Sequence, residues 1–333
     1  MIRKTLLAAL AVAGLLAGCA KPAADQTINF SILSAEDQTS MAKVWQPLID
    51  DMQAQTGLKV KPFFASNYTA LIEAMRFNQV QVGWFSALPA LEAVNRADAD
   101  VLARVITQGG QGVYQSVIIV KKGSGVTLAD VLRCGKRYNF GIGDARSTSG
   151  TLAPMTYVFI PNRIDPNDCF KVVRSASHQS NLFSVANGVL DVATNNTVGL
   201  LFAHRENPEL ADKVQVIWTS PLLPESSILA RRDVDPKVQA KLKAFFLGYG
   251  KAPGAEGDHE RQVLRGLDYA GFGPAGPDYL DPVREMDAGQ ALYDARKSGD
   301  AAKIAAAQKA YDAVEAQVAA HKAAIQDAGP ATS

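Results

Sequence analysis

The sequence has little net charge, few cysteines and few histidines, and these shortages exclude several classes of protein. Its 333 residues carry 34 Lys and Arg against 33 Asp and Glu, a formal net charge of +1. Nucleic-acid binders normally show a basic excess, so we expect no nucleic-acid partner. The three cysteines and four histidines form no cluster with metal-ligand spacing, so we expect neither a metal nor another cofactor.

Long apolar runs are also missing, except at the start of the chain. "MIRKTLLAALAVAGLLAGCA" has a basic beginning, a short apolar run and small residues at its end. This is the layout of a secretory signal, and the run is too short for an ordinary membrane span. Near its end, the four residues from Leu16 to Cys19 resemble a bacterial lipobox, which implies cleavage before Cys19 and a lipid on its sulfur.

We therefore expect a signal peptide with a lipobox over residues 1–19 and a polar tether over residues 20–27. The mature protein is then exported, as a periplasmic or cell-envelope lipoprotein that touches a membrane only through the lipid on Cys19. The alternative is a plain signal peptide with a chance cysteine.

Two further cysteines remain, Cys134 and Cys169, and each precedes a predicted strand, "RYNFGIG" and "FKVVRS". An even pair in an exported protein favours a disulfide. If the two strands are parallel neighbours, their starts lie side by side at a spacing that suits the bridge. We predict this disulfide, with two buried free thiols as the alternative.

Strand-like and helix-like segments alternate along most of the chain. Apolar residues from Met41 to Met52 recur at helical spacing and stop at Gly57, between the strand-like "INFSIL" and "LKVKPFF". Such alternation predicts an α/β fold with mostly parallel sheets flanked by helices. The chain turns glycine-rich at "KKGSGVT" and breaks again at "SPLLPE", so we expect two lobes joined by a two-crossing hinge near Lys122 and Leu222. The natural ligand site is the cleft between them.

These breaks define the expected boundaries. Lobe 1 comprises residues 28–122 and 223–284, and lobe 2 comprises residues 123–222. Residues 285–333 are Ala-rich with interspersed charges, which favours a long helical tail. That tail wraps lobe 1, mediates dimer contacts or is simply solvated, and the sequence leaves these alternatives open.

The stretch "GDARSTSGTLAP" places Ser147, Thr148, Ser149 and Gly150 after a predicted strand and before an apolar run. A helix N-terminus offers unpaired N–H groups and the positive end of the helix dipole, and hydroxyls add donors there. A cap needs one such residue, whereas this turn has three. The turn also falls at the carboxyl end of a strand, where α/β folds bind ligands, so we predict an oxyanion site.

Other polar or aromatic side chains end predicted strands at the same cleft edge and are candidate ligand contacts. Trp84 and Ser86 follow one strand, and Asn195 and Asn196 end another. Trp84 packs against the ligand or is simply core.

The chain resembles the phosphonate, phosphite and phosphate periplasmic binding proteins of ABC importers, in the type II superfamily. The resemblance runs from about residue 28 to about residue 250 and rests on ordered motifs. These are "NYTALIEAMR", "VGWFSALPALEA", "GVYQSVIIV", "GDARSTSGTLAP", "SASHQSNLFSVANGVLDVATNNT" and "ADKVQVIWTSPLLPESSILAR". It implies that Ser147, Thr148 and Ser149 grip phosphorus oxygens and that Tyr68, Tyr114 and His178 add donors. It further implies a permease and its ATPase as partners.

This sequence departs from the family pattern where relatives that take aminoalkylphosphonates carry two carboxylates. Val198 stands after "ATNNT", and the second region reads Pro224-Glu225-Ser226, with an acid one place early. An unpaired buried ammonium is expensive, so we predict an amine-free ligand: phosphite, phosphate or a small alkylphosphonate. Glu225 keeps an aminoalkylphosphonate as the alternative, and a sulfonate is another.

An enzyme is the competing class, with Ser147 or Ser149 as nucleophile and His178 as base. The sequence has no G-x-S-x-G elbow and no evident acid to orient the histidine, so we expect no enzyme. A ligand-sensing lipoprotein that signals to a receptor is not separable from a transport protein by sequence.

Overall fold

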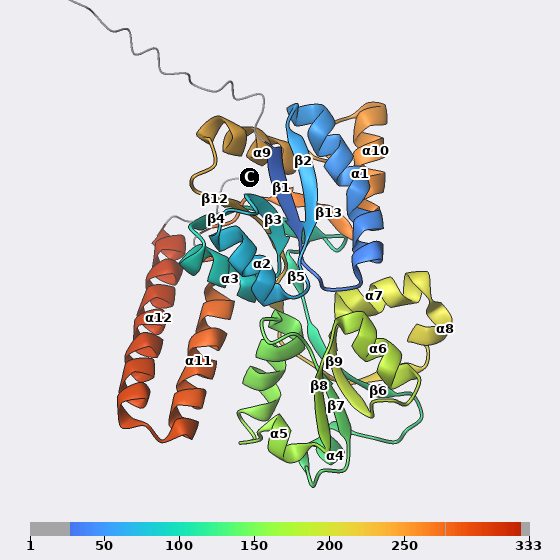
Figure 1. Ribbon diagram of the computed structural model, residues 1–333, viewed down its shortest axis with the longest axis vertical. Coiled ribbons are helices and arrows are strands. Elements are labelled where there is room, and N and C mark those ends of the chain that lie inside the picture. Colours follow the sequence, from blue (N-terminus) through green and yellow to red (C-terminus); the bar gives the residue numbers. More distant parts are fainter. Residues whose placement is uncertain (1–26, 277, 328–333) are drawn as a thin grey trace, which may run out of the picture.

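The structure, a computed structural model, describes residues 27–276 and 278–327. It has two α/β lobes, one above the other, with a helical hairpin along one side (Figure 1). The predicted signal peptide, Cys19 and nearly all of the tether lie outside the described residues. No helix within the described ranges is long and apolar enough to cross a membrane.

Lobe 1 is built on a six-stranded sheet with the order β13-β4-β12-β3-β1-β2. β1 pairs in parallel with both β2 and β3, whereas β12 and β13 pair antiparallel with their neighbours. The sheet is therefore mixed where we expected it to be mostly parallel, because two strands enter from the far end of the sequence. The strands are β1 (Thr27–Ile32), β2 (Lys59–Phe64), β3 (Val82–Phe85), β4 (Ala99–Thr107), β12 (Ser227–Arg231) and β13 (Tyr269–Gly273).

Five helices pack on this sheet. The first begins after Asp37, whose side chain caps it, and ends at Gly57, which adopts the left-handed conformation (φ 68°). Its apolar face buries Trp45 against Phe30 and Trp84, with ring centroids 5.8 and 5.2 Å apart. The helices are α1 (Gln38–Thr56), α2 (Tyr68–Arg76), α3 (Ala87–Arg96), α9 (Pro236–Gly248) and α10 (Gly254–Gly266).

Lobe 2 is built on a five-stranded sheet with the order β10-β6-β9-β7-β8. Its core is divided into two smaller apolar clusters, one containing Phe140, Phe159 and Phe170 and the other containing Leu182 and Val185. The strands are β6 (Ser116–Lys121), β7 (Asn139–Ile142), β8 (Val172–Ser175), β9 (Val192–Asn196) and β10 (Val214–Thr219). The helices are α4 (Leu128–Leu132), α5 (Pro166–Cys169), α6 (His178–Ala186), α7 (Thr197–Glu206) and α8 (Pro208–Ala211), with two π-helical turns, η2 (Thr148–Leu152) and η3 (Met155–Phe159).

Cys134 and Cys169 form a disulfide, with Cα atoms 4.4 Å apart. The two strands that follow them, β7 and β8, are parallel neighbours. The bridge therefore closes the end of lobe 2 that is remote from lobe 1 (Figure 1).

The lobes are joined by a two-stranded ribbon of β5 (Val113–Tyr114) and β11 (Leu223–Pro224). The first crossing therefore lies near Tyr114 and not near Lys122. β6 looked like the last strand of lobe 1, but it pairs with β9 and β10 of the second sheet. The glycine-rich "KKGSG" is an exposed turn of lobe 2 and not a linker.

The tail forms a hairpin of α11 (Asp281–Ser298) and α12 (Ala301–Asp327). α11 packs against α3 of lobe 1, against η2 and η3 of lobe 2, and against β11 of the ribbon. The tail therefore touches both lobes, where the sequence suggested lobe 1 alone, a dimer contact or solvent. The ion pair of Lys297 with Asp165 adds a contact to lobe 2.

Candidate functional site

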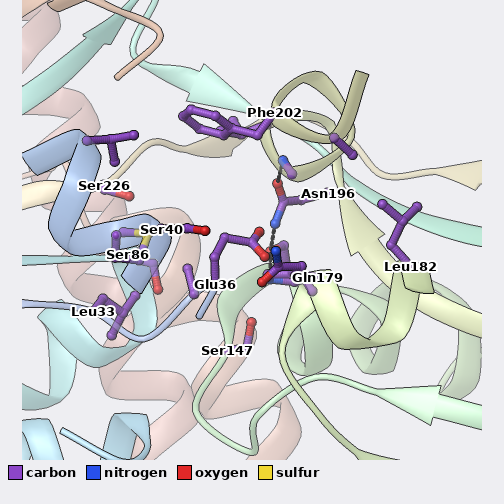
Figure 2. Close-up of a pocket in the computed structure, with 18 of the residues that line it drawn as sticks. Leu33, Glu36, Ser40, Ser86, Ser147, Gln179, Leu182, Asn196, Phe202 and Ser226 are labelled. Carbon is purple, nitrogen blue, oxygen red and sulfur yellow. Dashed lines mark hydrogen bonds between the residues drawn. The ribbon is translucent and has the colours of Figure 1, made fainter. Parts of the chain in front are cut away.

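A cavity of about 600 Å³ lies between the lobes (Figure 2). Eight of the ten predicted ligand residues line it: Tyr68, Trp84, Ser86, Tyr114, Ser147, Ser149, His178 and Asn196. The segments that supply them are far apart in the sequence and meet because the sheets of both lobes direct strand ends and helix starts toward the cleft.

The serine-rich turn is held against its sheet by a close glycine contact. A Cβ on Gly143 would lie 2.5 Å from the Cα of Gly150, so neither position has room for a side chain. The carbonyl of Gly150 accepts hydrogen bonds from the N–H of Gly143 (2.9 Å) and from the Thr194 hydroxyl (2.7 Å). An α-helix would need an N–H four residues on, but that residue is Pro154, which has none. This explains why π-helical turns replace the ordinary helix that we expected here.

Side-chain donors and acceptors gather around this turn. The hydroxyl of Ser147 accepts from the N–H of Gly150 (2.9 Å). The hydroxyl of Ser149 lies 3.3 Å from Nε2 of His178 and accepts from Nδ2 of Asn196 at 3.3 Å. Each of these groups is neutral and already oriented by a partner, which is the arrangement that stabilises an anion without reorganisation.

Two buried tyrosines complete this cluster. The hydroxyl of Tyr68 interacts with Ser147, and that of Tyr114 interacts with Ser149 and Thr148. Burial raises the pKa of both phenols well above the usual value, so both remain protonated donors at any physiological pH.

Five helix or turn N-termini converge on the cavity. Tyr68 and His178 are the first residues of α2 and α6, and Ser86, Ser147 and Asn196 precede α3, η2 and α7 as N-cap residues. The positive dipole end of each favours a bound anion. No Lys or Arg is among the described residues that line the cavity, so these dipoles supply its positive potential.

Thr148 and Asn195 are the two predicted contacts that do not line the cavity. The hydroxyl of Thr148 accepts from the N–H of Leu88 across the cleft at 2.8 Å. Asn195 donates from Nδ2 to the carbonyl of His178 (2.8 Å) and accepts the N–H of Asn196 (2.8 Å). Both side chains therefore form hydrogen bonds within the protein that position Leu88, His178 and Asn196.

Further contacts join the lobes across the cleft. The N–H of Tyr68 donates to Asp144 (3.2 Å), and the N–H of Asp37 donates to Gln179 (3.1 Å). Arg146 of lobe 2 forms an ion pair with Glu92 of α3 (2.7 Å). The two lobes are therefore in direct contact across the cleft, and both line the cavity.

The Ser149–His178 pair has the spacing of a nucleophile and its base but lacks the rest of that machinery. Burial lowers the pKa of His178 to about 4, so its imidazole is a poor proton acceptor at neutral pH. Nδ1 is buried and has no hydrogen-bond partner among the described residues, so no carboxylate orients the ring. The pair fits a neutral donor to an anion better than a catalytic dyad.

Sequence reasoning missed a set of residues on the lobe 1 side of the cavity. Glu36 follows β1 and Tyr269 begins β13, and both line the cavity. The position of Glu36 after the first strand was a usable signal, because the carboxyl ends of parallel strands meet at the ligand edge. No sequence signal marked Tyr269 as a cavity residue, because β13 lies more than 160 residues after β4, the strand with which it pairs. Others on this side are Leu33, Met41, Val44 and Trp45, and two further lining residues, Phe202 and Glu206, belong to α7 of lobe 2.

Comparison with known proteins agrees with this architecture. Residues 30–280 match the family described as "ABC transporter, phosphonate, periplasmic substrate-binding protein". The chain is 40% identical over 263 residues to the phosphonates-binding periplasmic protein of Escherichia coli, covering 79% of this chain and 76% of that one. It is 27% identical to a phosphate-import protein of Mycolicibacterium smegmatis, covering 66% and 71% of the two chains.

Among solved structures, a binding-protein component of an ABC phosphonate transporter from Pseudomonas aeruginosa superposes with a TM-score of 0.83. The two share 34% identity, and the match covers 89% of this chain and 99% of the other. The fold and cleft are those of a periplasmic binding protein. The chain belongs to the family of periplasmic substrate-binding proteins of ABC phosphonate transporters, whose members named here are transport proteins and not enzymes.

Proposed function

We propose that this protein captures a phosphorus oxyanion in the interlobe cavity and delivers it to the permease and ATPase of an ABC importer. The observation that carries the proposal is the cluster of neutral donors at converging helix N-termini, centred on Ser147, Ser149 and His178. Tyr68, Tyr114 and Asn196 lie within the same cluster, and the family membership supplies the transport context.

The ribbon of β5 and β11 is the hinge in this proposal. Residues on both sides of the cleft close over the ligand, since the Ser147 turn belongs to lobe 2 and Tyr68 to lobe 1. The cavity also leaves room for an organic substituent beyond the oxyanion, as an alkylphosphonate requires.

An amine-free ligand is one candidate, and Val198 is the observation that favours it. Val198 lines the cavity and supplies no charge there. Phosphite, phosphate and methylphosphonate satisfy the donor cluster without any cationic group. The carboxyl groups elsewhere in the cavity favour a second candidate, an amine-bearing phosphonate.

Isothermal titration tests the function. The purified protein is titrated with phosphite, phosphate, methylphosphonate and 2-aminoethylphosphonate, with 2-aminoethanesulfonate as the sulfonate control. Binding of at least one phosphorus ligand with little heat from the sulfonate supports the proposal. Silence from all phosphorus ligands, or preference for the sulfonate, refutes it.

We further propose that the chain is cleaved before Cys19 and that Cys19 then carries a lipid that anchors the protein to a bacterial membrane. Support comes from the order of small residues before Cys19. Cys19→Ala should move the protein from the membrane fraction to the soluble periplasmic fraction and abolish incorporation of labelled palmitate. Unchanged labelling in the variant would contradict lipidation at this residue.

A further inference from the structure

The serine-rich turn has two faces, and only one of them meets the cavity. Ser147 and Ser149 line the cavity, whereas Arg146 and Thr148, which alternate with them, do not. The side chains of this second pair contact lobe 1, as does that of Asp144 at the start of the turn. The segment that offers donors to the ligand is therefore also a segment that joins lobe 2 to lobe 1.

Two of these contacts are made to helix N-termini of lobe 1. Asp144 accepts from the N–H of Tyr68, the first residue of α2, at 3.2 Å. Thr148 accepts from the N–H of Leu88, the second residue of α3, at 2.8 Å. An N-cap side chain normally supplies such an acceptor, but Ser86 at the N-cap of α3 makes no cap bond. Lobe 2 therefore caps α3 in its place.

Arg146 makes the third contact, which is an ion pair. Its Nη1 lies 2.7 Å from Oε1 of Glu92 in α3. The Glu92 side chain is 12% exposed, so solvent screens this pair less than an ordinary surface pair. Because Arg146 does not line the cavity, its charge holds the two lobes together and is not presented to the ligand.

Asp287 of α11 brings the C-terminal hairpin into the same cluster. Burial raises the pKa of Asp287, and the positive charge of Arg146 opposes this shift. Burial also raises the pKa of Glu92, with Arg146 and Arg96 opposing the shift and Asp287 adding to it. Two partly buried carboxyl groups thus share the field of one guanidinium, and without it their like charges would repel each other.

We propose that Arg146 is a positioning residue of the ligand site, held in place by Glu92 of α3 and Asp287 of α11. Because Arg146 directly precedes the Ser147–Ser149 turn, this cluster fixes the turn relative to Tyr68, the donor from lobe 1. The inference rests on the proposed function. It gives the hairpin a part in ligand binding, although none of its described residues lines the cavity.

The first experiment measures how fast the ligand leaves. Stopped-flow tryptophan fluorescence of the purified protein follows the dissociation of methylphosphonate and of 2-aminoethylphosphonate. Arg146→Gln should raise the dissociation rate about two- to fivefold, as expected for loss of a partly exposed ion pair. Asp287→Asn should change the rate in the same direction.

A double-mutant cycle separates positioning from direct ligand binding. If Arg146 acts through Glu92, the effect of Arg146→Gln should largely vanish in a Glu92→Gln background. Arg146→Lys, which keeps the charge, should restore part of the wild-type rate. Arg133→Gln is the matched control and should leave the rate unchanged, because Arg133 forms an ion pair of the same 2.7 Å length with Asp130 inside lobe 2.

Amide hydrogen exchange gives a second readout, which needs no ligand. In the ligand-free protein, Arg146→Gln should speed the exchange of the N–H groups of Tyr68 and Leu88, because both donate to side chains of lobe 2. Exchange in the strands of both sheets should stay as in the wild type.

The outcomes separate this inference from the function on which it rests. An unchanged dissociation rate or unchanged exchange in Arg146→Gln overturns the inference, and so does an effect of equal size with and without Glu92. An unchanged rate in Asp287→Asn refutes the part assigned to the hairpin. Faster exchange, combined with failure of every phosphorus ligand to bind the wild type, supports the positioning of the turn and refutes the proposed function.

Discussion

The two lobes are built differently and bring different chemistry to the cavity. Lobe 1 has one large apolar core, whereas lobe 2 has two smaller clusters and a disulfide. Lobe 2 presents neutral donors that already have partners, such as Ser149 and Asn196, and lobe 1 presents carboxyl groups with unpaired oxygens, Glu36 and Glu225. The comparison indicates that lobe 2 supplies most of the oriented neutral donors, to which Tyr68 of lobe 1 adds its hydroxyl, and that the buried carboxyl groups come from the lobe 1 side.

The largest expected effect concerns the stability of lobe 2. Reducing the disulfide, whose cysteines are 35 residues apart, should cost about 4 kcal/mol in the chain-entropy account. Thermal unfolding followed by calorimetry, with and without reductant, measures it. Because both cysteines lie outside the residues lining the cavity, ligand affinity below the transition should hardly change. A matching loss of affinity would show that the bridge also shapes the site.

The next effect tests the neutral donors of lobe 2. Ser149→Ala removes a hydroxyl that lies between His178 and Asn196, and phosphonate affinity should fall about 10- to 100-fold, as for loss of a hydrogen bond to a charged group. Titration calorimetry measures this. Ser124→Ala, in an exposed turn of the same lobe, is the control. An unchanged affinity in Ser149→Ala would place the oxyanion elsewhere.

Backbone packing beneath the turn is tested by a glycine pair. Gly143→Ala forces a Cβ into the backbone of Gly150 and should destabilise the protein by about 1–3 kcal/mol. Gly248→Ala, in α9 of lobe 1, meets nothing within 4 Å and should stabilise by about 0.5–1 kcal/mol. Denaturant titration of both variants gives the sign of each change. A tolerated alanine at position 143 would mean that the turn is not fixed by this contact.

The smallest effect concerns how the free energy of unfolding of the ligand-free protein depends on pH, to which His178 and Glu36 contribute with opposite signs. Burial lowers the pKa of His178 to about 4, so the unfolded chain binds more protons and stability is lost as pH falls below 6.5. Burial raises the pKa of Glu36 to about 8, so its contribution is full below pH 4.5 and is lost as pH rises through 8.

Difference measurements against the wild type separate these two slopes. Relative to wild type, His178→Gln should gain about 1.5 kcal/mol in unfolding free energy between pH 6.5 and 5. Glu36→Gln should lose stability relative to wild type over the same interval. Slopes of the same sign would refute one of the two assignments.

The sequence allowed much of lobe 2 to be predicted because its signals are local. The Ser147–Ser149 turn follows its strand directly, and Cys134 and Cys169 precede adjacent strands. The first hinge crossing was misplaced because an apolar strand such as Ser116–Lys121 carries no mark of the sheet it will join. The carboxyl end of the cavity was only partly visible, because the charge balance depends on side chains that meet from β1, β11 and α7. Which side chains come together from distant segments is set by the fold and cannot be read from local sequence patterns.

The α11 helix has a consequence for how the protein moves. It holds lobe 1 through α3 and lobe 2 through η2 and η3, and its end is tied to Asp165. A rotation that parts the lobes must break one of these sets of contacts unless its axis runs close to α11 itself. The contacts of α11 therefore favour a rotation of the lobes about an axis along this helix, which opens the cleft on the side that faces away from the hairpin.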